Sequence, residues 1–265
     1  MKVVLFCGGL GTRLREFSDT IPKPMVSIGY RPIIWHLMKY YAHYGHKDFV
    51  LALGYRGDII KNYFLQYDEC LSNDFVLSNG GKSLHLYNSD IEDWSISFVD
   101  TGVNSNIGQR LMAVRRHLEG EEAFLANYTD GLSDLHLPSY LEHFHAHGKT
   151  AGFVVVKPPY SFHLVSADDK GNVKNITPAA KTDMWINSGF FAFKTSVFDY
   201  VKNGEELVEE PFQRLAAADQ LVAYRHHGFF ACMDTFKDKQ MFDTRHSAGD
   251  TPWEVWKNGP DGRGK

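Results

Sequence analysis

A glycine-rich loop close to the start of the chain carries the residue types that bind a polyphosphate. Gly8, Gly9 and Gly11 let backbone N–H groups approach an anion without obstruction from a Cβ atom. Arg13 adds a planar guanidinium that suits phosphate oxygens, and Lys23, between two prolines, adds a mobile point charge. Two cations behind a glycine loop fit a nucleoside triphosphate better than any other common ligand.

Spacing excludes two other phosphate-binding loops. The dinucleotide fingerprint requires a glycine three positions after Gly11, where this chain has Leu14. A Walker A loop requires Gly-Lys-Ser/Thr, whereas residues 11–13 read Gly-Thr-Arg. A glycine-rich turn that binds no ligand remains the alternative for the loop by itself, and Lys23 weighs against it.

Two aspartates are candidate metal ligands. Asp130 comes just after a predicted strand over 123–126, at the edge where open α/β sheets bind ligands. A carboxylate there suits a divalent metal that bridges triphosphate oxygens. Asp234 lies far away in the sequence, after the aromatic pair at 229–230. Taken alone, either aspartate is more often a turn or cap residue than a metal ligand.

Alternating strands and helices must position these side chains, and that alternation predicts an α/β sheet. Residues 2–7 form an apolar, β-branched run that predicts a buried parallel strand opening into the glycine loop. We expect one domain over residues 1–258 and a loose tail over 259–265. The pattern predicts helices over 32–44, 58–64, 109–117 and 137–147, and strands over 49–53, 84–87, 96–99, 123–126 and 150–156.

The composition limits the possible partners. The chain has 265 residues, of which 43% are apolar and 23% charged, as in ordinary globular proteins. A net charge of -4 without a basic stretch argues against nucleic acid as a partner. No apolar run approaches the ~20 residues of a membrane span, and no signal peptide is recognisable. We therefore expect a cytoplasmic protein with no membrane partner.

Other candidate sites are weak. The three cysteines are widely spaced and not in metal-like pairs, so we expect reduced thiols: Cys7, Cys70 and Cys232. Three nearby histidines predict a solvated helix end better than a metal site, because only the first and third share a helix face: His143, His145 and His147. The aromatic segment 253–256 is either a contact surface or packs on its own domain.

The chain resembles the sugar-1-phosphate nucleotidyltransferases, and the branch it resembles most is the glucose-1-phosphate cytidylyltransferases. The resemblance rests on Gly-x-Gly-Thr-Arg-Leu at 9–14 and Pro-Lys-Pro-Met at 22–25. It continues through Trp35-His36, Gly54-Tyr55 and the segments 99–102, 128–131, 187–191 and 233–235, nearly the whole chain. It implies an α/β, Rossmann-like (GT-A-like) three-layer fold around a mixed sheet, the nucleotidyltransferase fold.

The resemblance implies that an NTP, CTP in this branch, condenses with a sugar 1-phosphate or a related phosphate monoester and releases pyrophosphate. Positioning and charge neutralisation dominate such chemistry. Arg13 and Lys23 would be catalytic, and Mg²⁺ would bind Asp130 and Asp234. The nucleotide-binding residues implied are Gly8, Gly9, Gly11, Thr12, Arg13, Lys23, Thr101, Gly108, Arg110 and Tyr128. Arg110 would contact the cytosine carbonyl; its alternative role is an ion pair with an acid on the same helical stretch.

The acceptor side departs from the family pattern. The usual Glu-Lys-Pro is replaced by residues 175–181, and the usual Arg-Phe-Gly by residues 161–163. Lys181 is the expected substitute for the lost lysine. Tyr160, His163 and Asn187 are the other expected acceptor-binding residues, shaping a pocket for a modified sugar, a cyclitol or a polyol phosphate.

Two other function classes are weighed against this one. A nucleotide-sugar glycosyltransferase should carry an Asp-x-Asp pair, and residues 130–134 do not supply that spacing. A non-catalytic nucleotide-binding regulator would need neither Lys23 nor Asp234. Homo-oligomerisation is the expected assembly, although no motif specifies the number of subunits.

Overall fold

The computed structural model describes residues 1–8, 21–158 and 162–258. Its centre is a seven-stranded mixed sheet with the order β14-β10-β13-β8-β1-β4-β7, in which β13 runs antiparallel to both of its neighbours and the other pairs are parallel. The strands are β1 (Val3–Cys7), β4 (Asp48–Leu53), β7 (Ser95–Asp100), β8 (Ala123–Tyr128), β10 (Ala151–Val156), β13 (Ile186–Lys194) and β14 (Leu221–His226).

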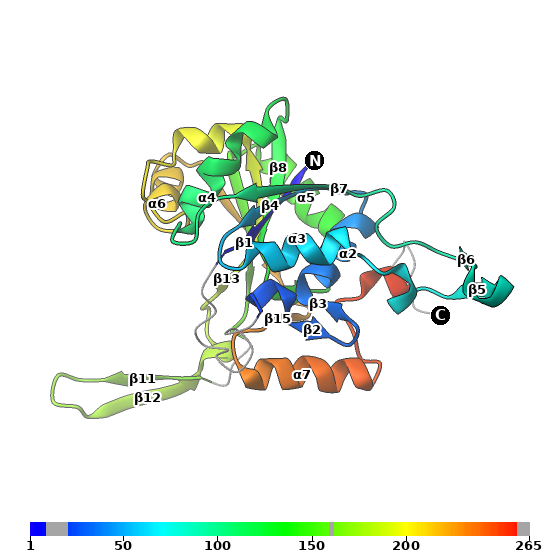
Figure 1. Cartoon of the computed structure of the whole chain (residues 1–265). Helices are drawn as coiled ribbons and strands as arrows, with labels where there is room; N and C mark the ends of the chain where they lie inside the picture. Colours follow the sequence, from blue (N-terminus) through cyan, green and yellow to red (C-terminus); the bar gives the residue numbers. More distant parts are fainter. Residues whose placement is uncertain (9–20, 159–161, 259–265) are drawn as a thin grey trace.

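Helices cover both faces of this sheet, which gives the three layers expected for the fold (Figure 1). Residues 3, 5 and 7 of β1 pack in one apolar core, and residues 4 and 6 pack in the other, because side chains alternate along a strand. The first core is covered by α2 (Ile33–His43), α3 (Gly57–Leu65), α5 (Leu137–His147) and α7 (Phe236–Ser247), and the second by α4 (Ile107–Val114) and α6 (Glu210–Ala217).

The helix predicted over 109–117 begins earlier in the structure, at Ile107. Asn106 caps it: its side chain accepts from the Gln109 amide at 2.8 Å, while the Gln109 side chain accepts from the Asn106 amide at 3.0 Å. This reciprocal capping box fixes the first turn, so the helix starts two residues before the periodic pattern does. A short 3-10 turn, Arg115–Leu118, follows α4 at its end.

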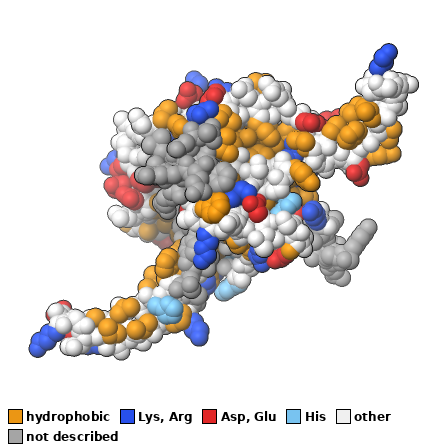
Figure 2. All heavy atoms as spheres, turned by 60° about the horizontal axis from the view of Figure 1, so that its bottom comes forward, with side chains coloured by type: hydrophobic (Ala, Val, Ile, Leu, Met, Phe, Trp, Pro, Cys, Tyr) orange, Lys and Arg blue, Asp and Glu red, His pale blue; other side chains and the backbone are white. Residues whose placement is uncertain are grey.

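Two hairpins project from the body (Figures 1 and 2). They are β5 (Phe75–Ser78) with β6 (Ser83–Leu86), and β11 (His163–Ala167) with β12 (Val173–Pro178). Sequence reasoning placed a strand near β6 but missed the β11–β12 hairpin. Asp168 and Gly171 are residue types that favour a turn, so the sequence carried a signal for this hairpin. In the structure the Asp168 carboxylate accepts from the Lys170 and Asn172 amides, and Gly171 has a φ of 82°.

Three smaller predictions concern the rest of the chain. The three cysteines are free, as expected. The aromatic segment 253–256 packs on its own domain: Trp253 is 1% exposed and contacts His36, Phe229 and Phe242. No helix in the described part of the chain has the length and apolarity needed to cross a bilayer.

Candidate active site

Three charged side chains predicted to act together meet at the carboxyl ends of the central strands. The Lys23 Nζ donates to Oδ2 of Asp130 and to Oδ1 of Asp234, each at 2.5 Å. We call these three residues the carboxylate cluster. Their side chains are 18%, 28% and 32% exposed, so the cluster can be reached from solvent. Both carboxylates thus accept hydrogen bonds from the same ammonium.

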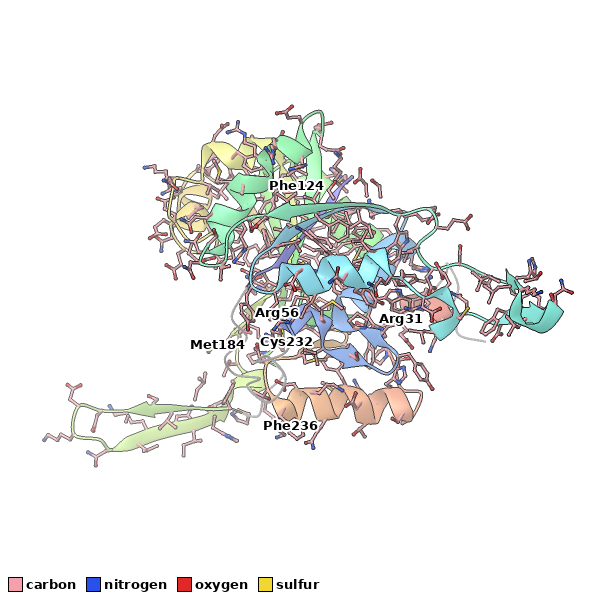
Figure 3. All side chains as sticks on the ribbon, in the orientation of Figure 1. Arg31, Arg56, Phe124, Met184, Cys232 and Phe236 are labelled. Carbon is pink, nitrogen blue, oxygen red and sulfur yellow. The ribbon has the colours of Figure 1, made fainter. Side chains whose placement is uncertain are left out.

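A small strand pair brings the two aspartates together. In the antiparallel pairing of β9 (Gly131–Ser133) with β15 (Phe230–Cys232), Gly131 lies opposite Cys232. Asp130 directly precedes β9 and Asp234 follows β15, so both reach the same end of the pair. The Met233 amide donates to the Asp130 carbonyl at 2.8 Å and extends the pairing to the cluster. Figure 3 labels Cys232 at this end of the strand pair.

The first turn of α7 holds Asp234 from the other side. The Asp238 carboxylate accepts from the amides of Asp234 at 3.1 Å and Thr235 at 2.8 Å. Thr235 in turn caps the helix by accepting from the Asp238 amide. Sequence reasoning missed this capping box, although Thr-x-x-Asp ahead of a helix resembles the usual signal.

Lys23 is fixed by a rigid local backbone. Lys23 stands between Pro22 and Pro24 and is the first residue of a 3-10 turn, Lys23–Met25. Pro24 and Met25 of this turn are buried. Burial by itself would lower the pKa of Lys23, but the charges and hydrogen bonds of Asp130 and Asp234 outweigh burial and raise that pKa above its ordinary value. Lys23 is therefore charged at neutral pH.

The donor set of the carboxylate cluster fits a divalent cation. Two carboxylate oxygens lie 2.5 Å from the same ammonium nitrogen, so they are no more than about 5 Å apart. Mg²⁺ prefers oxygen ligands and is commonly held by one or two carboxylates together with substrate phosphates and water. The described residues provide no group of three histidine, cysteine or acidic ligands, so a cation here would depend on substrate oxygens. The two histidines of α5 that share a face, His143 and His147, belong to no such group either.

Arg110 lies beside the start of the glycine loop and is 1% exposed. Its Nη1 donates to the Leu53 carbonyl at 3.1 Å and to the Thr101 hydroxyl at 2.7 Å. A Cβ atom on Gly8 would lie 1.9 Å from the Arg110 Cζ, and one on Gly54 would lie 2.7 Å from its Nη1. The guanidinium therefore packs against two glycine backbones at the ends of β1 and β4. Among the described residues Arg110 forms no ion pair, so a role as partner of an acid on its own helix gains no support.

The other predicted site residues of the described ranges fall in three places. Tyr128, at the end of β8, lies within hydrogen-bonding reach of the Asn187 side chain, and a Cβ atom on Gly189 would lie 2.4 Å from its ring. Gly108 packs against protein backbone, because a Cβ atom there would lie 2.2 Å from the Glu205 carbonyl oxygen. The two predicted residues His163 and Lys181 are exposed at the base of the β11–β12 hairpin. Five predicted residues lie outside the described part of the chain: Gly9, Gly11, Thr12, Arg13 and Tyr160.

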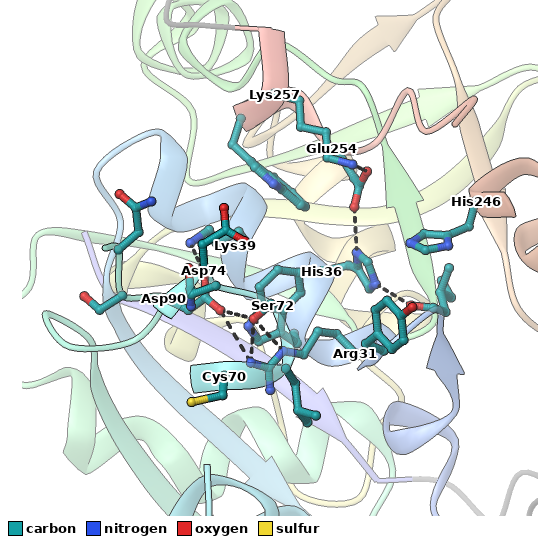
Figure 4. Close-up of a pocket in the computed structure, with 18 residues that line it drawn as sticks. Arg31, His36, Lys39, Cys70, Ser72, Asp74, Asp90, His246, Glu254 and Lys257 are labelled. Atoms are coloured by element: carbon teal, nitrogen blue, oxygen red, sulfur yellow. Dashed lines mark hydrogen bonds and ion pairs between the residues drawn. The ribbon is translucent and has the colours of Figure 1, made fainter. Parts of the chain in front are cut away.

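A second charged cluster lines a cavity of about 930 Å³ between the start of α2 and the base of the β5–β6 hairpin (Figure 4). Asp90 accepts from Lys39 at 2.8 Å, Tyr67 at 2.9 Å and Ser72 at 2.5 Å, and its carboxylate lies 3.5 Å from the Arg31 guanidinium. We call these five residues the Arg31–Asp90 network. No motif in the sequence indicated it, because its members come from separate segments.

Comparison with known proteins shows consistent similarities. Residues 2–238 match the model of a family described as nucleotidyl transferase. The chain is 38% identical to a glucose-1-phosphate cytidylyltransferase of Salmonella typhi and 36% identical to a probable glucose-1-phosphate cytidylyltransferase of Bacillus subtilis, and each alignment covers 97% of this chain and 100% of the relative. A UDP-glucose pyrophosphorylase from Acinetobacter baumannii has the same fold, with a TM-score of 0.69, 17% identity and 96% coverage of each chain.

Proposed function

Because the chain belongs to the nucleotidyl transferase family, we propose that it transfers a cytidylyl group from CTP to a sugar 1-phosphate and releases pyrophosphate. The names of the relatives that align over their whole length support CTP as the nucleotide and glucose 1-phosphate as the first acceptor to test. The observation that carries the proposal is the convergence of Lys23, Asp130 and Asp234 at the carboxyl ends of the strands. Open α/β sheets bind their ligands at this edge.

The proposed reaction is one displacement at the α-phosphorus of CTP. A phosphate oxygen of the acceptor forms the new P–O bond, and the bond to the β-phosphate breaks, so pyrophosphate leaves with its electron pair. A bound Mg²⁺ would neutralise charge on the α-phosphate. Asp130 and Asp234 would hold that ion, and Lys23, released from the two carboxylates, would contact the oxygen on which negative charge develops.

Arg110 and Gly8, one of the two glycines that it packs against, would form the base end of the nucleotide site. The Arg110 guanidinium donates to carbonyl oxygens and one hydroxyl, and it forms no ion pair within the described residues, although the charge of Asp100 acts on it. The charged guanidinium raises the local positive potential beside the loop. Gly8 leaves room for it, and the same glycine lets backbone N–H groups approach the nucleotide.

The test is a screen of pyrophosphate release. The full chain is incubated with Mg²⁺, one of the four common nucleoside triphosphates and one phosphate monoester: glucose 1-phosphate, another sugar 1-phosphate, a cyclitol phosphate or a polyol phosphate. We expect release with CTP and a sugar 1-phosphate. Release with another triphosphate only would overturn the choice of nucleotide, and no release in any combination would overturn the enzymatic function.

The same screen separates two further functions. Turnover of CTP with a cyclitol or polyol phosphate, but not with glucose 1-phosphate, would support a cytidylyltransferase for a different acceptor; the replaced acceptor-side segments, which include His163 and Lys181, are the reason to include those esters. Binding of CTP without pyrophosphate release would support a nucleotide-binding regulator instead.

We also propose that the chain assembles with copies of itself. Apolar side chains are exposed along both projecting hairpins (Figure 2). Two-stranded hairpins are at best marginally stable alone, so a covering surface would stabilise them. Light scattering coupled to gel filtration gives the subunit number, and a strictly monomeric chain at micromolar concentration would contradict the proposal.

A further inference from the structure

The proposed reaction places its two substrates on opposite sides of the carboxylate cluster. The attacking and leaving oxygens are roughly in line in phosphoryl-type transfer, so the acceptor approaches from the side opposite the pyrophosphate. Gly8 and Arg110 line the β1–β4 half of the sheet edge, where the nucleotide is proposed to bind. Asp130 follows β8 at the middle of that edge. The remaining half is formed by β13, β10 and β14, and this is the side open to the acceptor.

An aromatic side chain and two cations lie together at that half of the edge. In the sheet register Val156 lies opposite both Ile186 and His226, so Lys157, Trp185 and His227 follow one step further, and the Trp185 and His227 ring centres are 5.1 Å apart. Arg225 lies opposite Val155, one step earlier. The Lys157 Nζ lies 4.4 Å from the centre of the Trp185 ring, and the Arg225 Cζ lies 5.3 Å from it. We call Lys157, Trp185 and Arg225 the acceptor cluster.

The acceptor cluster adjoins residues already placed in the site. Trp185 directly precedes β13 and is two residues before Asn187, a spacing that in extended backbone puts both side chains on one face, about 7 Å apart along the chain. The Asn187 side chain in turn contacts Tyr128, two residues before Asp130. Figure 3 shows Met184, which precedes Trp185 and is 48% exposed, where the β11–β12 hairpin joins the body.

The two cations are not compensated by acids. Neither Lys157 nor Arg225 takes part in an ion pair within the described ranges. Lys157 donates to the Thr182 carbonyl, and the Arg225 side chain is exposed. Two such charges produce a positive potential on the acceptor side of the two aspartates. This pattern suits a substrate with an anionic phosphate that must approach a metal-binding aspartate pair.

We propose that Lys157 and Arg225 bind the phosphate of the acceptor and that Trp185 is a positioning residue that holds both cations by cation–π contact. This inference rests on the proposed function and names the residues of its acceptor side. Arg225 offers a planar fork of donors, Lys157 a compact point charge, and both suit a phosphate group. A cation–π contact restrains two long side chains that would otherwise sample many rotamers.

The test measures KM separately for the two substrates. Lys157→Ala and Arg225→Ala should each raise the KM for the acceptor about tenfold, because each removes one charge-assisted phosphate contact. The KM for CTP should stay within about twofold. Lys157→Arg should retain most of the affinity, and Trp185→Phe should retain more than Trp185→Ala. Lys149→Ala is the matched control, because Lys149 precedes the other end of β10 and pairs with Asp219.

A binding measurement separates this inference from the proposed function. Glucose 1-phosphate is titrated into the full chain by calorimetry, with and without CTP and with Ca²⁺ in place of Mg²⁺. Tryptophan fluorescence is followed in the unchanged chain and in Trp185→Phe, because the chain has five tryptophans. We expect binding to the unchanged chain and at least a tenfold loss in the Lys157→Ala/Arg225→Ala double variant. If no triphosphate is turned over, the proposed function fails, and this titration still decides on the acceptor cluster. Three results would overturn the inference. The single variants could keep the acceptor KM of the unchanged chain, the double variant could bind glucose 1-phosphate as tightly as the unchanged chain, or the unchanged chain could fail to bind it.

Discussion

The carboxylate cluster and the Arg31–Asp90 network are both groups of charged side chains, yet their charges are balanced differently. In the network, Asp90 is 8% exposed and Arg31 is 2% exposed. Arg31 also donates to Ser72 and to the Asp68 carbonyl, and its guanidinium lies 4.2 Å from the centre of the Tyr67 ring. In the carboxylate cluster, two partly exposed aspartates share the single ammonium of Lys23.

The comparison shows that a cavity rich in charged groups is not by itself a sign of chemistry. Burial alone would raise the pKa of Asp90, but hydrogen bonds from Lys39, Ser72 and Tyr67 outweigh it and lower that pKa. The Asp90 carboxylate is thus met by two cations and two hydroxyl groups of the protein, and the network ties the β5–β6 hairpin to α2. The carboxylate cluster instead is partly exposed at a strand end, where a cation and a substrate can reach its oxygens.

The largest expected effect is on turnover. Asp130→Asn and Lys23→Ala should each reduce pyrophosphate release about 10³-fold or more, because each removes a group that stabilises charge in the transition state. The thermal unfolding temperature should change little, since both side chains are partly exposed.

The matched control for this prediction is Asp134→Asn. Asp134 lies just after β9 and pairs with His226 at 2.9 Å, away from the carboxylate cluster. Turnover should be retained in that variant. Normal turnover in Asp130→Asn or Lys23→Ala would show that the carboxylate cluster is not the site of the reaction.

The second effect is on stability. Asp90→Ala should lower the free energy of unfolding by about 3 kcal/mol, because it leaves the buried Arg31 without its anionic partner. Turnover per folded molecule should be unchanged. Urea unfolding and pyrophosphate release, measured on the same preparation, check both statements. A loss of turnover without a loss of stability would show that the Arg31–Asp90 network takes part in the reaction after all.

Much of the fold could be predicted because its strands are continuous apolar runs. The run over 2–7 and the apolar positions of α2 match the strand and helix that the structure contains. The projecting hairpins were predicted less well. Their strands are exposed and carry no buried face, so the alternation that marks a core strand is missing from β11 and β12.

Some residues of the candidate site could likewise be predicted from the sequence, and others could not. Lys23, Asp130 and Asp234 could be selected from local motifs, but only the pairing of β9 with β15 shows why two distant aspartates meet. Lys157 and Arg225 could not be selected at all, because neither stands in a motif. Their proximity depends on the register of three strands that are far apart in the sequence.

A third prediction concerns acid stability and the same cavity as the Arg31–Asp90 network. Burial lowers the pKa of His36 from 6.5 to about 4, and its Nε2 lies 3.1 Å from the Ile28 carbonyl. Between these two pH values the unfolded chain binds a proton that the folded chain does not bind. The free energy of unfolding should therefore fall by about 2 to 3 kcal/mol as the pH falls from 6.5 towards 4.

Urea unfolding at a series of pH values measures this slope. His36→Gln keeps an amide donor for the Ile28 carbonyl but cannot titrate, so the slope should be smaller in that variant. His43 and His46, whose pKa values burial also lowers, leave a residual slope of the same sign. An identical slope in the variant and the unchanged chain would show that His36 does not contribute.

The smallest effect tests directly whether charge balance distinguishes the two clusters. Lys23 competes with a metal ion for the two carboxylates, so Lys23→Ala should bind Mn²⁺ about tenfold more tightly in the absence of nucleotide. Lys39→Ala is the matched change in the Arg31–Asp90 network. It should create no Mn²⁺ site, because Asp90 keeps Arg31, Tyr67 and Ser72. Calorimetric titration measures both affinities. Equal or weaker Mn²⁺ binding in Lys23→Ala would mean that the two aspartates do not form a cation site, even though one ammonium brings them together.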